Sequence, residues 1–116
     1  MTTVSVIGCG NMGGALIKGL SRSGTYEIIA CDLDESVLNE MEPYCAETTA
    51  ETARAGTADI VVVAVKPKYV SEVLDSLELT PEQTLVTIAA GITTDFVAER
   101  TDATVVRVMP NLAAET

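Results

Sequence analysis

Two patterns of apolar residues alternate along the chain, one typical of buried strands and one typical of helices. The clearest strand is the run from Ile60 to Val65, in which five residues are β-branched and no polar residue interrupts the pattern. Such a run is typical of a central parallel strand that is covered on both faces. The segment that follows, residues 68–77, carries apolar residues at i, i+3, i+4 and i+7 and predicts an amphipathic helix.

Applied to the whole chain, these patterns predict six strands separated by helical segments. The strands are expected over residues 3–7, 26–31, 45–48, 60–65, 84–89 and 104–109. Helices or helical turns are expected over residues 11–21, 35–42, 49–55, 68–77 and 94–99, the second of them capped by Asp34. Because parallel strands joined by helices cross over right-handedly, this alternation predicts one α/β domain over residues 1–116. It would be a Rossmann-type doubly wound parallel sheet with strand order 3-2-1-4-5-6.

The first strand leads into a glycine motif with the spacing of a phosphate-binding loop. Gly8, Gly10 and Gly13 form the pattern GxGxxG between the strand and the first helix. Gly8 suits a tight turn, Gly10 leaves room for a pyrophosphate, and Gly13 allows the helix and the strand to pack closely. The N–H groups at the start of the helix would face the phosphates, so the motif predicts a dinucleotide-binding site.

Further stretches with ligand-binding chemistry end at the same edge of the predicted sheet, where the strand order reverses and ligands bind. Asp32 stands where a carboxylate accepts hydrogen bonds from an adenosine ribose and repels a 2′-phosphate; alternatively it only caps the following turn. Residues 64–67 and 88–91 either pass against the cofactor or form an ordinary loop and a close-packed turn. Met12 either covers the dinucleotide or packs in the core.

The charge of the chain narrows the range of partners. Among 116 residues there are 17 acids and 7 bases, which gives a formal net charge of −10. This balance disfavours nucleic acid and anionic membrane surfaces as partners, because both attract basic proteins. It fits a well-solvated acidic surface or, alternatively, the halophilic-type acidic surface of a protein from a salt-rich cytoplasm.

The cysteine and histidine content limits the disulfide, metal-binding and catalytic chemistry expected of the chain. Cys9, Cys31 and Cys45 follow neither a disulfide nor a metal-ligand spacing, which favours buried thiols, a cytoplasmic location and no metal site. No histidine is present, and no set of residues with proton-transfer chemistry stands out, so no catalytic residue is expected in this chain. No signal peptide or membrane-spanning run is expected either.

Four segments together resemble the N-terminal domain of pyrroline-5-carboxylate reductase. They are VSVIGCGNMGGALIKGL at 4–20, AVKP at 64–67, TIAAGIT at 87–93 and RVMPN at 107–111. The resemblance implies an oxidoreductase that transfers a hydride from NAD(P)H to the imine of 1-pyrroline-5-carboxylate, giving L-proline in proline biosynthesis. It also implies a second, all-helical domain, absent from this chain, that forms homo-oligomers and supplies catalytic and substrate contacts. We therefore expect the 116-residue chain to bind dinucleotide with little reductase activity.

The sheet edge and the resemblance together give a set of candidate site residues. The candidate cofactor contacts are Ile7, Gly8, Cys9, Gly10, Asn11, Met12, Gly13, Asp32, Ala64, Val65, Lys66, Pro67, Ile88, Ala89, Ala90 and Gly91. Asn111 would lie near the nicotinamide and the small-molecule substrate.

The chain departs from the family pattern at three places. Leu112-Ala113 replaces a common Thr-Pro, and Glu51 stands where many members have Asn, so neither contact is carried over. Asp32 stands where many members have Ser or Arg, which favours NADH over NADPH. Three alternatives stay open: a deazaflavin-dependent NADP reductase, a β-hydroxyacid dehydrogenase, and a non-catalytic dinucleotide-binding module.

Overall fold

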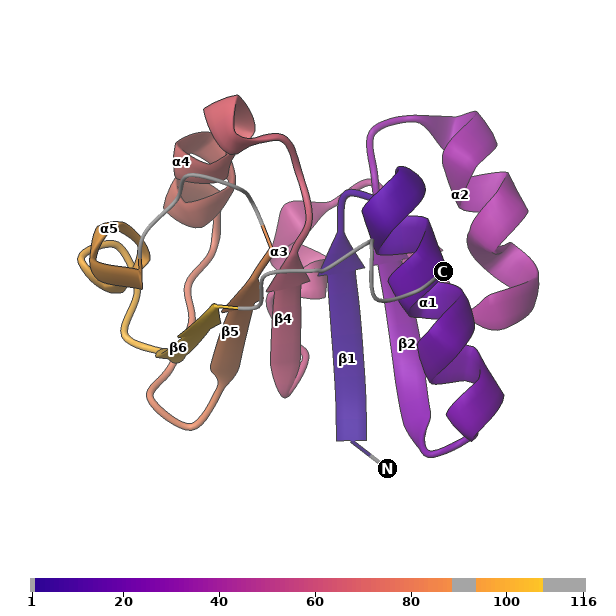
Figure 1. Ribbon diagram of the computed structural model, residues 1–116, viewed down its shortest axis with the longest axis horizontal. Helices are drawn as coiled ribbons and strands as arrows, with labels where there is room; N and C mark the ends of the chain where they lie inside the picture. The colour runs from indigo at the N-terminus through magenta and orange to yellow at the C-terminus, as the bar shows by residue number, and fades with distance from the viewer. Residues whose placement is uncertain (1, 89–93, 108–116) are drawn as a thin grey trace, which may run out of the picture.

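A parallel sheet forms the centre of the molecule, with helices on both faces, in the computed structural model, which describes residues 2–88 and 94–107 (Figure 1). The strands are β1 (Thr2–Ile7), β2 (Tyr26–Cys31), β3 (Glu47–Thr49), β4 (Ile60–Val63), β5 (Thr84–Thr87) and β6 (Thr104–Arg107). The helices are α1 (Asn11–Ser23), α2 (Glu35–Met41), α3 (Thr52–Ala55), α4 (Pro67–Ser76) and α5 (Thr94–Ala98), with a 3-10 turn η1 (Glu42–Tyr44). All neighbouring strands are parallel, in the order β3-β2-β1-β4-β5-β6, so the predicted fold class and strand order are confirmed.

Successive side chains of the central strands fill two separate cores. Val61 and Val63 of β4 pack in a core shared with α3, α4 and α5. Val62 of the same strand lies in the other core, with Ile17 of α1 and Leu38 of α2. Both faces of β4 are therefore buried, which explains why its sequence is apolar without alternation.

Several elements end earlier or later than the sequence predicts. The fourth strand stops at Val63, not at residue 65, because Pro67 is the first residue of α4 and the chain must leave the sheet before it. The third strand begins at Glu47, not at residue 45, because the turn η1 intervenes and the Cys45 N–H donates to the Glu42 carbonyl. The expected ends of the fifth and sixth strands, residues 88–89 and 108–109, lie beyond the observed strands and largely outside the described residues.

Two polar side chains fix local structure around the sheet. The Asp34 carboxylate accepts the Ser36 N–H at 3.0 Å and begins α2, as the sequence predicts. Gln83 joins the turn before β5 to the loop before β4: its amide nitrogen donates to the carbonyls of Gly56 and Ala58 at 2.8 and 2.7 Å. The same side chain accepts the Thr80 N–H at 2.8 Å.

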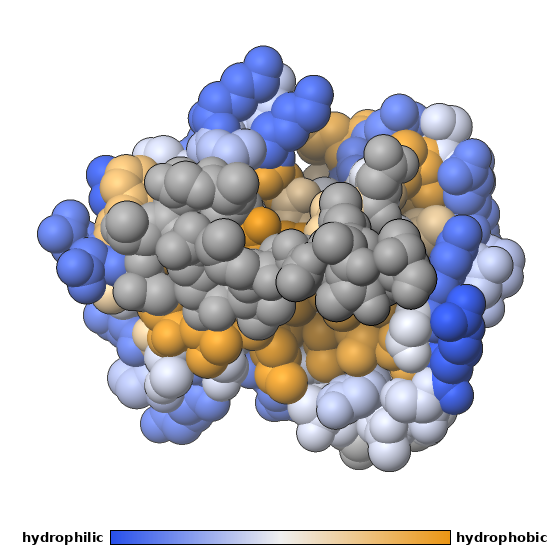
Figure 2. All heavy atoms as spheres, in the orientation of Figure 1, coloured by the Kyte–Doolittle hydropathy of each residue, from blue (hydrophilic) through white to orange (hydrophobic). Residues whose placement is uncertain are grey.

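Hydrophilic and apolar side chains are unevenly distributed over one face of the molecule. Hydrophilic side chains gather around the rim of the face shown in Figure 2, and apolar side chains gather over the middle of the sheet. Within the described residues, two ion pairs join acids to bases, Arg54–Glu47 at 2.8 Å and Arg100–Glu99 at 4.0 Å. No helix in the described part of the chain has the length and apolar character needed to cross a bilayer.

Candidate functional site

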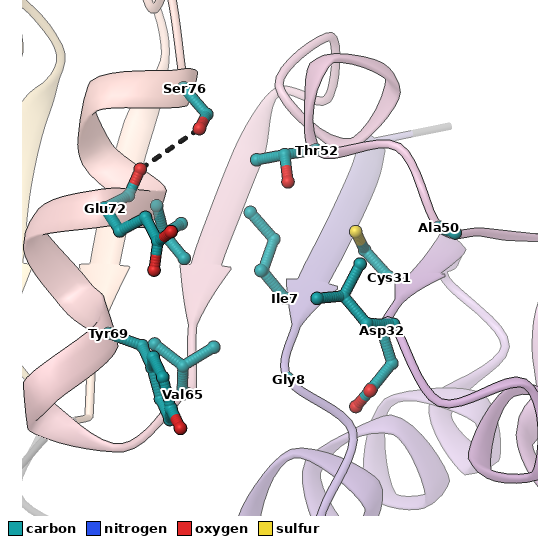
Figure 3. Close-up of a pocket in the computed structure, with 12 residues that line it drawn as sticks. Ile7, Gly8, Cys31, Asp32, Ala50, Thr52, Val65, Tyr69, Glu72 and Ser76 are labelled. Atoms are coloured by element: carbon teal, nitrogen blue, oxygen red, sulfur yellow. Dashed lines mark hydrogen bonds between the residues drawn. The ribbon is translucent and has the colours of Figure 1, made fainter.

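The candidate site lies at the carboxyl edge of the sheet, where β1 lies between β2 and β4. Helices α1 and α2 pack on one face of the sheet and α3 to α5 on the other, so the chain crosses over in opposite directions on the two sides of β1. A crevice forms outside the strand ends at such a reversal. The segments that follow β1, β2 and β4 meet there, as the sequence predicts (Figure 3).

The glycine motif forms a tight turn between β1 and α1. Gly8 has a φ of +94°, and a Cβ there would approach the Val65 N to 2.9 Å, so both its conformation and its surroundings require glycine. A Cβ on Gly13 would come within 1.9 Å of the Gly8 carbonyl oxygen, which confirms the close approach of helix and loop. A Cβ on Gly10 would meet nothing within 4 Å, so open space lies beside the first turn of α1.

Asp32 follows β2 and joins two segments of the edge. One carboxylate oxygen accepts the Cys9 N–H of the glycine loop at 2.8 Å, and the other accepts the Asp34 N–H at 2.9 Å. The turn-capping interpretation of Asp32 is therefore correct, and a second role in holding the glycine loop adds to it. Each carboxylate oxygen keeps a further acceptor site, so neither bond prevents contact with ribose hydroxyls.

A cavity of about 440 Å³ opens beside Asp32 (Figure 3). Its size lies within the range of small-molecule sites, roughly 300–1,000 Å³. Four of its lining residues are among the sequence candidates: Ile7, Gly8, Asp32 and Val65.

The rest of the cavity lining was missed by sequence reasoning. Helix α4 contributes Tyr69, Glu72, Val73 and Ser76. They recur at i, i+3, i+4 and i+7, so they share one face of the helix, next to the buried face that predicted the helix. The spacing in the sequence could therefore have indicated these lining residues. The remaining lining residues, from the β2–β3–α3 side, are Cys31, Leu33, Ala50 and Thr52.

Other candidates lie around the glycine loop or beyond the described residues. Cys9 and Gly10 line a second hollow of about 360 Å³ between α1 and α2. Asn11 begins α1, Met12 and Ala64 are half-buried, Lys66 and Pro67 are exposed at the start of α4, and Ile88 is half-buried after β5. Ala89, Ala90, Gly91 and Asn111 lie outside the described residues.

The three cysteines are free thiols with raised pKa values. Burial, reinforced by the charge of Asp32, raises the pKa of Cys9 to about 12. Burial and Asp32 likewise raise the pKa of Cys31 to about 11, against a hydrogen bond from Thr52, and burial raises that of Cys45 to about 11. All three are protonated at neutral pH, which argues against nucleophilic or redox chemistry. In the described parts of the chain, no cluster of three or more acidic, Cys or His side chains is arranged to hold a metal.

The arrangement fits a dinucleotide. The open space beside Gly10 and the uncapped start of α1 provide room and N–H donors for a pyrophosphate. Asp32 provides acceptors for a ribose, and the adjoining cavity has apolar walls for a base. The thiols of Cys9 and Cys31 stay protonated at neutral pH, and what the loop, Asp32 and the cavity walls offer a ligand is binding and orientation.

Comparison with known proteins identifies several similar chains. Residues 3–91 match the model of a family described as NADP oxidoreductase, coenzyme F420-dependent. The chain is 35% identical to the pyrroline-5-carboxylate reductase of Mycobacterium leprae, over 98% of this chain and 43% of that protein. It is 36% identical to the enzyme of the same name from Methanosarcina acetivorans, over 96% of this chain and 44% of that protein.

A solved structure shares the same arrangement. The 1-pyrroline-5-carboxylate reductase of Streptococcus pyogenes superposes with a TM-score of 0.75 at 28% identity, over 97% of this chain and 44% of that chain. The chain therefore spans less than half the length of each of these three reductases.

Proposed function

Since the chain belongs to the family of NADP oxidoreductases described as coenzyme F420-dependent, we propose that it is the dinucleotide-binding part of a pyrroline-5-carboxylate reductase. The observation that carries the proposal is the meeting of the glycine loop, Asp32 and the adjoining cavity at one sheet edge. The identity of about 35% to curated reductases of that name, over nearly the whole chain, supports the choice of substrate class.

Each part of the edge has a role in this proposal. The loop from Gly8 to Gly13 and the first turn of α1 bind the pyrophosphate, and Asp32 accepts hydrogen bonds from the adenosine ribose. Residues 64–67 and 88–91 flank the dinucleotide, and Asn111 lies near the nicotinamide. When bound, the reduced nicotinamide supplies a hydride for the imine carbon; the residues of this chain bind and orient the cofactor and exclude water around it.

We further propose that NADH is preferred over NADPH. The residues known to line the cavity include two acids, Asp32 and Glu72, and no lysine or arginine. A 2′-phosphate would be repelled by the Asp32 carboxylate and would find no cation in this lining to compensate its charge.

The greater length of the relatives supports the assignment of cofactor binding and substrate binding to different parts of the enzyme. We propose that substrate contacts and homo-oligomer formation belong to the part of the longer enzymes that this chain does not match. The isolated 116 residues would then bind NADH without reducing pyrroline-5-carboxylate, and steady NADH oxidation by this chain with that substrate would contradict this assignment. A cytoplasmic location is part of the same proposal, supported by three free thiols.

A deazaflavin-dependent NADP reductase is the second candidate, because the family description names that coenzyme. The two candidates differ in the cofactor they need. A pyrroline-5-carboxylate reductase of this type requires NADH alone, whereas the second candidate requires NADP together with the deazaflavin.

Calorimetric titration of the 116-residue chain tests the proposal. We expect NADH to bind more tightly than NADPH, and the deazaflavin to bind neither the free chain nor its dinucleotide complex. Tighter binding of NADPH would overturn the role given to Asp32. Absence of binding by both dinucleotides would overturn the proposed function as a whole.

A further inference from the structure

The Glu72 carboxylate is an unused acceptor inside the cavity. Glu72 lies on α4 and lines the cavity across from Asp32 (Figure 3). The side chain is exposed. In the described part of the chain its carboxylate takes part in no hydrogen bond and no ion pair.

The other polar groups of the lining are already engaged or differ in chemistry. Asp32 accepts two backbone N–H groups, and the Ser76 hydroxyl donates to the Glu72 main-chain carbonyl at 3.0 Å. Thr52 and Tyr69 carry hydroxyls, which can donate as well as accept a hydrogen bond. A carboxylate only accepts hydrogen bonds, so Glu72 adds a requirement for a donor on the ligand.

The cavity indicates where the hydrogen-bond donor of the ligand would lie relative to the ribose. With the ribose at Asp32 and the pyrophosphate at the glycine loop, the base extends away from the loop into the remaining space. That space has apolar walls, including Ile7, Val65 and Val73, which suit the faces of a planar ring. Glu72 lines the same space, so a base placed between these walls would present its edge to the Glu72 carboxylate.

We propose that Glu72 selects the base of the dinucleotide by accepting a hydrogen bond from the exocyclic amino group of adenine. Adenine presents an N–H donor at C6, whereas hypoxanthine presents a carbonyl oxygen at the same position. A carboxylate attracts the first and repels the second, and a hydrogen bond to a charged group discriminates more strongly than a neutral one. The inference rests on the proposed binding of a dinucleotide at this edge.

The test compares NADH with reduced nicotinamide hypoxanthine dinucleotide by calorimetric titration of the 116-residue chain. We expect the chain to bind NADH about tenfold more tightly than the hypoxanthine analogue. In Glu72→Gln the side-chain amide can accept from the amino group or donate to the carbonyl, so the two affinities should agree within about twofold. Glu78→Gln, an exposed glutamate outside the cavity, is the matched control and should keep the wild-type ratio.

The outcomes separate this inference from the proposed function. Binding of NADH with the same affinity ratio in the wild type and in Glu72→Gln would overturn the role of Glu72 and leave the dinucleotide site standing. Equal binding of both ligands by the wild type would have the same meaning. Failure of the folded wild type to bind either ligand would overturn both proposals, with far-ultraviolet circular dichroism establishing that the variants are folded.

Discussion

The Asp32 carboxylate accepts the main-chain N–H of Cys9 at 2.8 Å and so ties the end of β2 to the glycine loop. The two residues are separated by 23 positions in the sequence, and the bond spans neighbouring strand ends. Asp32, to which the proposed function assigns the ribose, therefore also stabilises the glycine loop, to which it assigns the phosphates. Charge and loop geometry can be separated by choosing substitutions that remove one without the other.

Asp32→Asn removes the charge and keeps one oxygen for the Cys9 N–H, while its amide nitrogen cannot accept the Asp34 N–H. We expect NADH to bind about tenfold more weakly, because the ribose loses a charged acceptor. NADPH should bind more tightly than in the wild type, because the repulsion of its 2′-phosphate is gone. Calorimetric titration with both cofactors measures the reversal, and an unchanged ratio would refute the assignment.

Asp32→Ala removes both the charge and the acceptors. The affinity ratio should shift toward NADPH as in Asp32→Asn, and both affinities should fall below those of Asp32→Asn because the glycine loop also loses its hydrogen bond. Loss of the acceptor leaves the Cys9 N–H unpaired and lowers the free energy of unfolding by about 1–3 kcal/mol. Glu35→Gln removes a nearby exposed charge outside the cavity and is expected to change neither the affinity ratio nor the stability noticeably.

Gly13→Ala tests the packing of α1 on the loop. The new Cβ would lie 1.9 Å from the Gly8 carbonyl oxygen, and because that atom is backbone it cannot simply rotate away. We expect a loss of about 1–3 kcal/mol in the free energy of unfolding, together with weaker dinucleotide binding as the loop shifts.

Gly19→Ala is the matched control in the same helix. Its Cβ would meet nothing within 4 Å, so the substitution should stabilise the chain by about 0.5–1 kcal/mol through helix propensity. Urea denaturation of both variants gives the comparison, and a similar change in both would contradict the packing role of Gly13.

The buried thiol of Cys9 predicts a loss of stability in alkali. Burial raises its pKa in the folded chain to about 12 from an ordinary value of 9.0, so the folded chain holds the thiol proton more tightly than the unfolded chain does. The contribution to stability is therefore complete below about pH 9 and is lost as the pH rises toward 12. The slope is at most about 1.4 kcal/mol per pH unit.

Denaturation from pH 8 to pH 11 in the wild type and in Cys9→Ala isolates this contribution. The free energy of unfolding should fall less steeply in the variant, because the other titrating groups are common to both. Parallel curves would show that Cys9 ionises as easily in the folded chain as in the unfolded one.

The net charge of −10 predicts a response to salt. Raising KCl from about 0.1 M to about 1 M shortens the Debye length from about 10 Å to about 3 Å and screens repulsion between carboxylates. The melting temperature should therefore rise across this range, more in KCl than in the same concentration of a non-ionic osmolyte. An unchanged melting temperature would contradict the interpretation of a halophilic-type surface.

The layout of the sheet could be predicted because each of its determinants is local or repetitive. Gly8 and Gly13 have the surroundings that their spacing implies, and the uninterrupted run in β4 identified a strand buried on both faces. Strand ends were harder to predict, because Pro67 acts on Ala64 and Val65 through the helix it begins and not through their own preferences.

The lining of the cavity could be predicted only in part. The predicted members follow strand ends, where topology alone brings segments together. Tyr69 and Glu72 lie on a helix, and whether an exposed helical stripe faces a cavity depends on the direction in which α4 packs on the sheet. Gln83 was missed for a similar reason, since its partners Gly56 and Ala58 lie on another loop that only the folded sheet brings near.

The hydrogen bond from Cys9 to Asp32, together with the ribose contact proposed for Asp32, has an evolutionary consequence. Under that proposal, a lineage that changes its cofactor preference by replacing this aspartate with a residue that lacks an acceptor also removes a hydrogen bond from its own glycine loop. Small replacements such as Ala or Gly carry a structural cost before any benefit in cofactor use appears. Viable paths begin with residues that keep an acceptor for the Cys9 N–H, so the order in which mutations arise is constrained by the loop as well as by the cofactor.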